Sequence, residues 1–297
     1  MLRALPRALR PQRLWKALLA RGCASDGAAA GPEIQVRALL GPDQGITEIL
    51  MNRPRARNAL GNVLVGELLE ALARLREDQQ VRVLLFRSGV KGVFCAGADL
   101  KEREQMSQAE VGVFVQRLRG LMNEIAAFPA PTIAAVDGFA LGGGLELALA
   151  CDLRVAAASS AVMGLIETTR GLLPGAGGTQ RLPRCVGVAL AKELIFTGRR
   201  LNGIQAQALG LVNHTVSQNE EGDAAYHQAR ALAQEILPQA PTAVRLGKVA
   251  IDRGMEVDIA SGMVIEGMCY AQNIPTRDRL EGMAAFREKR PPKFVGE

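Results

Sequence analysis

The segment 132–178 constrains the fold most, because it places a cluster of glycines between a predicted strand and a predicted helix. The apolar run 132–136 is bounded by glycine and is too short for a helix, so it predicts a buried strand. The glycine triplet 142–144 follows, and then the helix formers 145–150. Glycines at such a junction let the backbone approach a ligand, and the first N–H groups of the helix can hold an anion.

Two acids accompany this predicted anion-binding turn. Glu146 lies just inside the helix, and Glu167 precedes the glycine-rich loop 171–178. Taken singly, each feature has an ordinary structural explanation: a glutamate in a first helical turn stabilises the helix dipole, and the loop could be a plain turn. A nucleotide loop is not indicated, because G-x-G-x-x-G is absent here and no Gly-Lys-Ser/Thr follows. An anion-binding turn with two carboxylates, and with no metal ligand or nucleophile beside them, is the more informative combination.

Three motifs in order resemble the enoyl-CoA hydratase/isomerase (crotonase) family. They are Ala96-Gly97-Ala98-Asp99-Leu100, the segment 140–146 and the segment 174–182. The resemblance covers about residues 34–297 and implies an α/β fold, a crotonase-type spiral of ββα units with a C-terminal helical part. It also implies a homotrimer, often doubled to a hexamer, in which the helical part closes over the site.

The local patterns agree with an α/β core that is followed by helices. Strands are expected over 34–40, 45–51, 81–86 and 132–136, and helices over 61–77 and 107–128. Beyond about residue 201 the sequence favours helices, over 222–237, 242–252, 257–272 and 276–289, with one strand near 212–216. We therefore expect three parts: 1–32 as transit peptide and linker, 33–200 as crotonase core, and 201–297 as a helical part for oligomerisation and CoA covering.

The net charge of +6 is carried by the N-terminal tail. Residues 1–25 hold six basic residues and no acid, and subtracting these six from 36 leaves 30 basic against 30 acidic residues. The tail is rich in Arg, Leu and Ala and resembles a mitochondrial transit peptide, with a disordered tail without an address as the alternative. Arginines interrupt every apolar run, so no membrane span is expected. We expect a protein of the mitochondrial matrix.

The five cysteines are scattered and odd in number, which fits a reducing compartment without a disulfide framework. No Cys-x-x-Cys pair or His–Cys cluster suggests a metal. No cofactor is expected, since coenzyme A would be part of the substrate. The methionines at 255, 263, 268 and 283 are interpreted as helix packing.

The resemblance implies specific roles for four residues. In the family an acyl-CoA thioester forms an enolate, whose oxygen is held by two backbone N–H donors; the matching donors are those of Ala98 and Gly143. Glu146 matches the acid that orients and activates water, and Glu167 the acid that shares this water and protonates C2. The presence of both acids favours hydration over isomerase, hydrolase or decarboxylase reactions.

Further residues match positions that contact the substrate. Arg55 and Lys101 correspond to positions that meet the nucleotide phosphates, and Phe286 and Lys289 to a segment at the adenine end, often from another subunit. Solvated surface residues are the alternative for each of them. The motif residues Ala96, Asp99 and Leu100 complete the expected substrate contacts. Candidates for the acyl pocket are Phe114, Val115, Leu118 and Leu172.

One feature of the sequence and two alternative functions stand against this interpretation. The stretch before Glu167 contains 156–160, one residue longer than is usual in the family; we expect a bulge or turn there, whereas a shifted register would turn Glu167 away. RNA binding is an alternative of another class, and a catalytically silent scaffold is a third. The helix segment 61–80 has no Lys and two Arg against four acids, so little RNA binding is expected.

Overall fold

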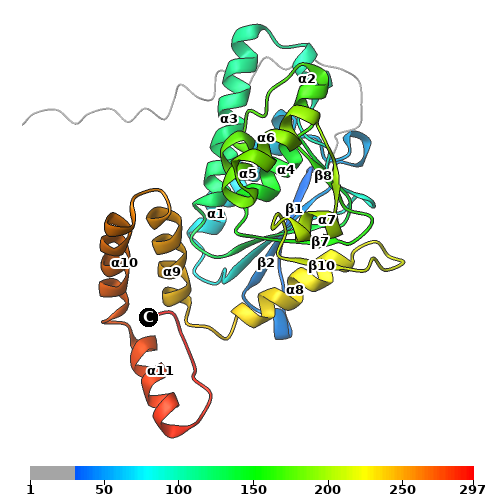
Figure 1. The fold of residues 1–297 in the computed structure, drawn as a ribbon. Coiled ribbons are helices and arrows are strands. Elements are labelled where there is room, and N and C mark those ends of the chain that lie inside the picture. The colour runs from blue at the N-terminus through cyan, green and yellow to red at the C-terminus, as the bar shows by residue number, and fades with distance from the viewer. Residues whose placement is uncertain (1–30) are drawn as a thin grey trace, which may run out of the picture. The chain divides into compact units, whose positions relative to one another are not determined.

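The computed structural model describes residues 31–297, so the predicted transit peptide lies outside the described residues. Residues 32–297 form one compact unit, which contains two sheets and their covering helices (Figure 1). The expected division near residue 200 stays a prediction. No helix within 31–297 is long and apolar enough to cross a membrane.

The larger sheet has six strands in the order β1-β2-β3-β5-β7-β10. Its strands are β1 (Ile34–Ala38), β2 (Ile46–Met51), β3 (Val83–Ser88), β5 (Thr132–Val136), β7 (Leu153–Ala157) and β10 (His214–Val216). Only β1 runs antiparallel to its neighbour. The central strands are apolar on both faces because helices cover both sides, as parallel sheets require. The strands expected from the sequence are confirmed.

The smaller sheet has the order β4-β6-β8-β9. Its strands are β4 (Val93–Cys95), β6 (Phe139–Leu141), β8 (Val162–Gly164) and the antiparallel β9 (Leu201–Asn202). Successive pairs β3–β4, β5–β6 and β7–β8 each give one strand to each sheet before the chain passes to a helical segment. This is the expected ββα spiral. It also places the segments that follow β4, β6 and β8 at one edge of the smaller sheet.

Within residues 31–297, seven α-helices precede the C-terminal group. They are α1 (Asn62–Arg76), α2 (Leu100–Glu104), α3 (Gln108–Ala126), α4 (Gly143–Ala150), α5 (Gly178–Val186), α6 (Val188–Thr197) and α7 (Gly203–Ala208). The predicted helices over 61–77 and 107–128 are confirmed. Ser107 is the N-cap of α3 and forms a reciprocal capping box with Glu110. It ends shortly before Pro129, which cannot continue a helix.

The C-terminal helices differ in their packing. They are α8 (Ala224–Ile236), α9 (Pro241–Gly254), α10 (Ile259–Asn273) and α11 (Arg277–Glu288), close to the predicted ranges. The buried face of α8, including Ala225 and Ala229, packs on the larger sheet. Helices α9 and α10 pair with each other where Gly254 and Gly262 approach closely. These two helices and α11 lie beyond α8, at one end of the unit (Figure 1).

The prediction that four methionines pack between these helices is wrong for the single chain. More than half of the surface of each of these methionines is exposed; they are Met255, Met263, Met268 and Met283. Where Gly254 and Gly262 meet, α9 and α10 approach closely, and the methionine side chains stay exposed. The helices α9 to α11 therefore carry an uncovered apolar surface.

Candidate active site

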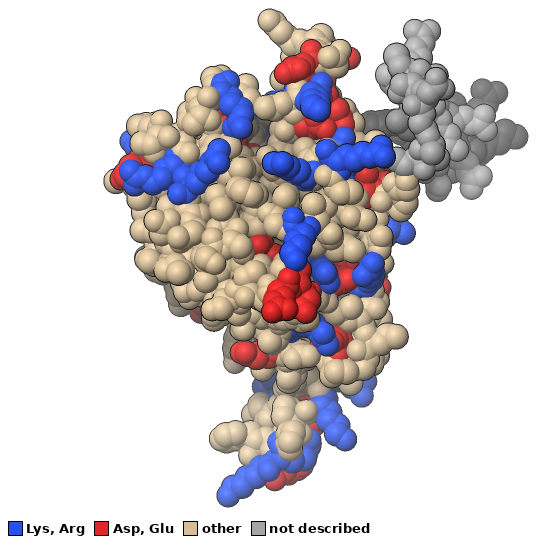
Figure 2. All heavy atoms as spheres, turned by 90° about the vertical axis from the view of Figure 1, so that its right-hand side faces the viewer, with Lys and Arg blue, Asp and Glu red and all other residues tan. Residues whose placement is uncertain are grey.

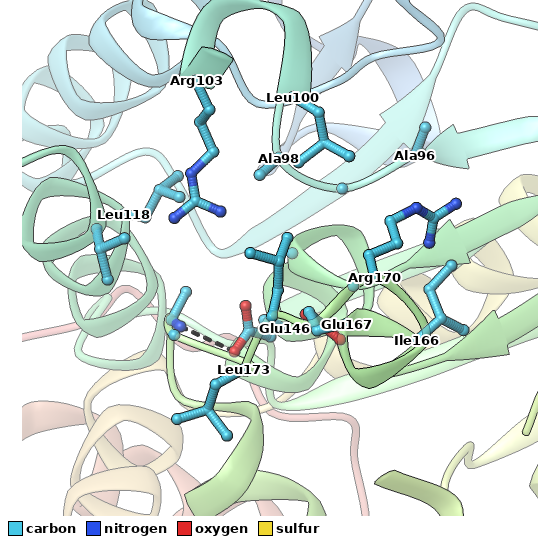
Figure 3. A pocket seen from close by; sticks show the side chains of 17 residues that line it. Ala96, Ala98, Leu100, Arg103, Leu118, Glu146, Ile166, Glu167, Arg170 and Leu173 are labelled. Atoms are coloured by element: carbon cyan, nitrogen blue, oxygen red, sulfur yellow. Dashed lines mark hydrogen bonds between the residues drawn. The ribbon is translucent and has the colours of Figure 1, made fainter. Parts of the chain in front are cut away.

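A cavity of about 120 Å³ lies where the segments after β4, β6 and β8 meet. It is lined by the turn after β4 with Ala98, by Gly142 and Gly143 at the start of α4, and by both predicted acids. Glu146 and Glu167 lie next to each other on one side of this space (Figure 3). Side chains of α3 and of the loop 171–176 close it with apolar groups, among them Val115, Leu118, Leu172 and Leu173.

Within the described part of the chain, the backbone N–H groups of Ala98 and Gly143 are free to donate hydrogen bonds to a ligand. Leu60 donates to the Gly97 carbonyl at 2.7 Å and accepts from the Asp99 N–H at 3.2 Å, so the Ala98 N–H between them points away from Leu60. Gly143 is the first residue of α4, where an N–H has no partner inside the helix. Within residues 31–297 neither N–H donates a hydrogen bond to another group.

Glycine is needed where these two backbones approach each other. A Cβ on Gly143 would stand 3.5 Å from the Ala98 nitrogen, so the two donors are neighbours. Gly97 has φ of +102°, which other residues rarely adopt, and its Cβ would lie 2.7 Å from the Leu141 oxygen. A Cβ on Gly144 would lie 2.1 Å from the Cys95 oxygen. Two free N–H groups held side by side form an anion-binding site.

Glu146 is almost fully buried, with 3% of its surface exposed. Its Oε1 accepts hydrogen bonds from the N–H groups of Ala176 and Gly178, both at 2.8 Å. Burial raises the pKa of this carboxyl, and the two N–H donors limit the rise because they favour the charged form. The bonds also fix the side chain's orientation, which leaves Oε2 for a ligand or water.

Glu167 begins the short 3-10 helix η3 (Glu167–Arg170) directly after β8. Burial is the main cause that raises its pKa to about 7, and the charge of Glu146 adds to the rise. Its Oε2 is buried and has no hydrogen-bond partner within the described residues. The residues 158–160 form a turn between β7 and β8. The extra length is therefore accommodated before β8, and Glu167 faces the cavity.

This arrangement can bind an anion and transfer protons beside it. The N–H pair can hold an oxygen that becomes negative, and two carboxyls with different environments stand next to it. Near neutral pH Glu167 is close to half protonated and can donate a proton, whereas the charged form of Glu146 is supported by two donors. A water held between them would have an acceptor on one side and a proton source on the other.

Of the three motif residues that were predicted to contact the substrate, two line the cavity and one does not. Ala96 and Leu100 line it. Asp99 does not; it caps α2 by accepting from the N–H groups of Lys101 and Glu102, and it pairs with Arg53 at 2.7 Å. Its position is that of a residue that holds α2 in place.

Four predicted contacts lie on the surface. Arg55 is exposed in the 3-10 helix η2 (Pro54–Ala56), and Lys101 is exposed on α2. Phe286 is 89% exposed on α11, and Lys289 caps that helix; neither lines the cavity of its own chain. Their proposed CoA contacts stay predictions.

One pocket prediction needs correction, and two residues were missed. Phe114 is 4% exposed, belongs to the buried core cluster and does not line the cavity, unlike its neighbour Val115. Two arginines, Arg103 on α2 and Arg170 on η3, line the cavity but were not predicted. In the sequence both stand in ordinary polar segments, so only their placement reveals them.

Comparisons with known proteins agree with this geometry. Residues 41–297 match the family model described as enoyl-CoA hydratase/isomerase. The chain is 89% identical to the human enoyl-CoA hydratase domain-containing protein 2, mitochondrial, covering 96% of this chain and 97% of that protein. It is 53% identical to the human mitochondrial methylglutaconyl-CoA hydratase, covering 99% and 90%. The crystal structure of an enoyl-CoA hydratase from Bacillus anthracis superposes with a TM-score of 0.84 at 44% identity, covering 89% of this chain and all of that one.

Proposed function

The chain belongs to the enoyl-CoA hydratase/isomerase family, and we propose that it is a hydratase that adds water across the 2,3 double bond of an enoyl-CoA thioester. The observation that carries this proposal is the pair of acids. Glu146 and Glu167 line one cavity, next to the two free N–H groups of Ala98 and Gly143. Relatives that run other reactions on CoA thioesters need the N–H pair but do not need both acids.

In the proposed reaction the thioester oxygen accepts hydrogen bonds from Ala98 and Gly143. Electron density moves from the double bond to this oxygen as water attacks C3, so the donors stabilise the enolate more than the ground state. Loss of one such donor commonly lowers the rate by about a hundred- to a thousandfold. The positive end of α4 lies at the same point and favours the same charge.

The two acids divide the proton transfers. Glu146, held by Ala176 and Gly178, takes a proton from the water that forms the C3–O bond. Glu167, whose pKa is raised to about 7, gives its proton to C2. Water thereby loses one proton to Glu146 and the enolate gains one from Glu167. The two carboxyls regain their starting states when a proton moves between them, directly or through solvent.

The same family assignment supports a CoA-bound, oligomeric, mitochondrial enzyme. Arg55 lies in η2 and Lys101 in α2, and an ion pair of 3.1 Å between Arg53 and Glu102 links these two elements. We assign Arg55 and Lys101 to the nucleotide phosphates. The uncovered apolar surface of α9 to α11 supports a homotrimer or hexamer, in which Phe286 and Lys289 meet the adenine end. The protein is mitochondrial, as are its relatives at 84% and 89% identity by name, and we assign it to the matrix.

RNA binding is not part of the proposal. One face of the molecule shows basic and acidic side chains next to each other rather than a continuous basic surface (Figure 2). On α1, Arg76 is paired with Glu124 at 2.7 Å, which leaves less charge for phosphates. Since affinity for nucleic acid depends on the number of phosphates neutralised, we expect weak binding.

The proposal is tested by measuring hydration of crotonyl-CoA and longer 2-enoyl-CoA esters, with the 3-hydroxyacyl product identified by mass. We expect Glu146→Gln and Glu167→Gln each to lower kcat/KM by about a hundred- to ten-thousandfold, because glutamine keeps the shape but cannot exchange the proton. Binding of butyryl-CoA, which has no double bond, should change much less.

A matched control is Glu104→Gln on α2, an exposed acid outside the cavity, which should keep normal turnover. Full activity in Glu167→Gln would contradict the two-acid mechanism. Formation of a shifted double bond or of free CoA, without a hydroxyacyl product, would reassign the chain to another reaction of the family.

A further inference from the structure

Two arginines hold the glycine-rich loop 171–178 from outside the cavity. Arg119 of α3 donates from Nε and Nη2 to the carbonyl oxygen of Gly175, at 3.2 and 3.1 Å. Arg181 of α5 donates from Nη1 to the carbonyl oxygen of Ala176 at 3.2 Å. It also donates to a side-chain amide oxygen of α3 at 3.0 Å, so its guanidinium links both helices to the loop. Hydrogen bonds from a charged donor are stronger than neutral ones.

The same loop holds Glu146 on its inner side. Its Oε1 accepts from the N–H groups of Ala176 and Gly178, and one of these bonds is marked at Glu146 in Figure 3. The C=O of Gly175 and the N–H of Ala176 belong to one planar trans peptide group, in which they point in opposite directions. Arg119 and Glu146 therefore bind the two ends of a single peptide group. A donor at the oxygen polarises this group and strengthens its N–H as a donor.

Two glycines let the arginine and the acid come this close to the backbone. Gly177 has φ of +111°, and a Cβ on it would lie 2.1 Å from Nη1 of Arg181. A Cβ on Gly178 would lie 2.9 Å from Oε1 of Glu146. The loop thus accommodates a cation on one side and the carboxylate on the other.

The charges around Glu146 differ in their direction of action. Burial raises its pKa, and the two N–H donors and then the charges of Arg181 and Arg119 oppose the rise. Within residues 31–297 the charged groups near this carboxyl come from four elements: Arg103 of α2, Arg119 of α3, Arg181 of α5, and Glu167 and Arg170 of η3. The two arginines that hold the loop favour the ionised form of Glu146, which is the form that can take a proton from water.

We propose that Arg119 and Arg181 are positioning residues, which act on Glu146 through the backbone of the loop. This inference rests on the proposed function, in which Glu146 takes a proton from water. Because the loop is held from outside, its two N–H groups keep Oε1 of Glu146 in place and leave Oε2 for the water. Neither arginine lines the cavity, so neither touches the substrate.

The first measurement is hydration of crotonyl-CoA by Arg119→Met and Arg181→Met. We expect kcat to fall by about ten- to a hundredfold in each, because a small displacement of the base weakens proton transfer. KM should change much less, since the thioester oxygen is held by Ala98 and Gly143. Arg119→Lys and Arg181→Lys keep the positive charge and an N–H donor and should recover part of the loss. An unchanged kcat in both Met variants would overturn the inference.

The pH profile distinguishes positioning from a general loss of structure. Without either arginine the effect of burial is less opposed, so the acid limb of kcat/KM, assigned to Glu146, should move to higher pH. The alkaline limb, assigned to Glu167, should move less, because burial raises that pKa and the arginines that oppose the rise are Arg170 and Arg103. A loop that is merely loosened would lower kcat/KM equally at every pH, and that result would refute the inference.

Two further arginines of the same helices serve as matched controls. Arg117 of α3 contacts Asn62. Arg184 of α5 donates to the carbonyl oxygen of Gln180. Within residues 31–297 neither donates a hydrogen bond to residues 175–178. Arg117→Met and Arg184→Met should keep the kcat and the pH profile of the wild type. An equal fall of kcat in these controls would overturn the inference, because the effect would then come from general charge.

Amide hydrogen exchange tests the same link without turnover. The N–H groups of Ala176 and Gly178 should exchange about ten- to a hundredfold faster in Arg119→Met, the range expected for loss of a charge-assisted bond. In Glu146→Ala the acceptor is gone, so adding Arg119→Met should accelerate exchange little further. This result supports the positioning role even if the wild type hydrates no ester and the hydratase proposal fails. Unchanged exchange in Arg119→Met, or effects of the two substitutions that multiply, would refute the positioning role.

Discussion

The raised pKa of Glu167 predicts a particular pH dependence of both activity and stability. Burial, supported by the charge of Glu146, raises this pKa to about 7. If Glu167 must be protonated to deliver the C2 proton, kcat/KM should fall about tenfold per pH unit above that value, because kcat/KM reports the free enzyme. The assay is hydration of crotonyl-CoA at subsaturating concentration from about pH 5.5 to 9.

The same group sets the sign of the stability change. The folded-state pKa lies above the ordinary value of 4.5, so between about 4.5 and 7 the folded chain binds more protons than the unfolded one. Stability is therefore lost as pH rises through this window. Linkage at about 1.4 kcal/mol per pH unit gives an upper bound of about 3 kcal/mol. Since the side chain is partly solvated, we expect about 1–2 kcal/mol.

Glu167→Gln isolates this contribution, because glutamine does not titrate. Urea unfolding at pH 5 and at pH 8 should show a smaller loss of free energy of unfolding in the variant than in the wild type, by about 1–2 kcal/mol. The reasoning is refuted if both proteins lose the same stability between these pH values. It is also refuted if the kcat/KM of the wild type stays constant from pH 6 to pH 9.

Three further predictions follow from the site and its backbone. The double variant Glu146→Gln/Glu167→Gln should hydrate crotonyl-CoA little more slowly than the slower single variant, since residues that act as a unit are not additive; a product of the two single losses would contradict this. Gly144→Ala should strongly destabilise the fold, measured by urea or thermal unfolding, because its Cβ would lie 2.1 Å from the backbone oxygen of Cys95; wild-type stability would show that the two backbones can separate easily. The processed protein should bind single-stranded RNA weakly in ~150 mM salt, and a sub-micromolar Kd there would count against a purely metabolic role.

Local patterns in the sequence were sufficient to predict the positions of most helices and strands. The apolar run of β5, which Gly138 follows, and the prolines after α3 each act over a few residues, so the positions of these elements could be predicted closely. The two-sheet spiral came from the family resemblance, since strand order depends on pairings between distant segments. The positions of Ala98 and Gly143 side by side have the same non-local origin.

The cavity arginines could not be predicted for a related reason. Arg103 stands in the charged run 101–104, a pattern typical of a solvated helix face. Its direction is set by Asp99, which caps α2 and pairs with Arg53, a residue far away in the sequence. The exposed methionines of α9 to α11 show another limit: a pattern of apolar residues indicates burial but does not say whether the covering surface belongs to the same chain.

The site contains backbone groups, which the fold positions, and side chains, which depend on the residue type. The two N–H donors are backbone groups that follow the adjacent parallel strands β4 and β6, so their placement depends on the fold and on these glycines more than on other side chains. The proposed hydration, in contrast, depends on two side chains that line the same cavity, Glu146 from α4 and Glu167 after β8. One backbone anion-binding site can thus serve many reactions, and in the proposed mechanism the acids on two different elements determine which reaction follows.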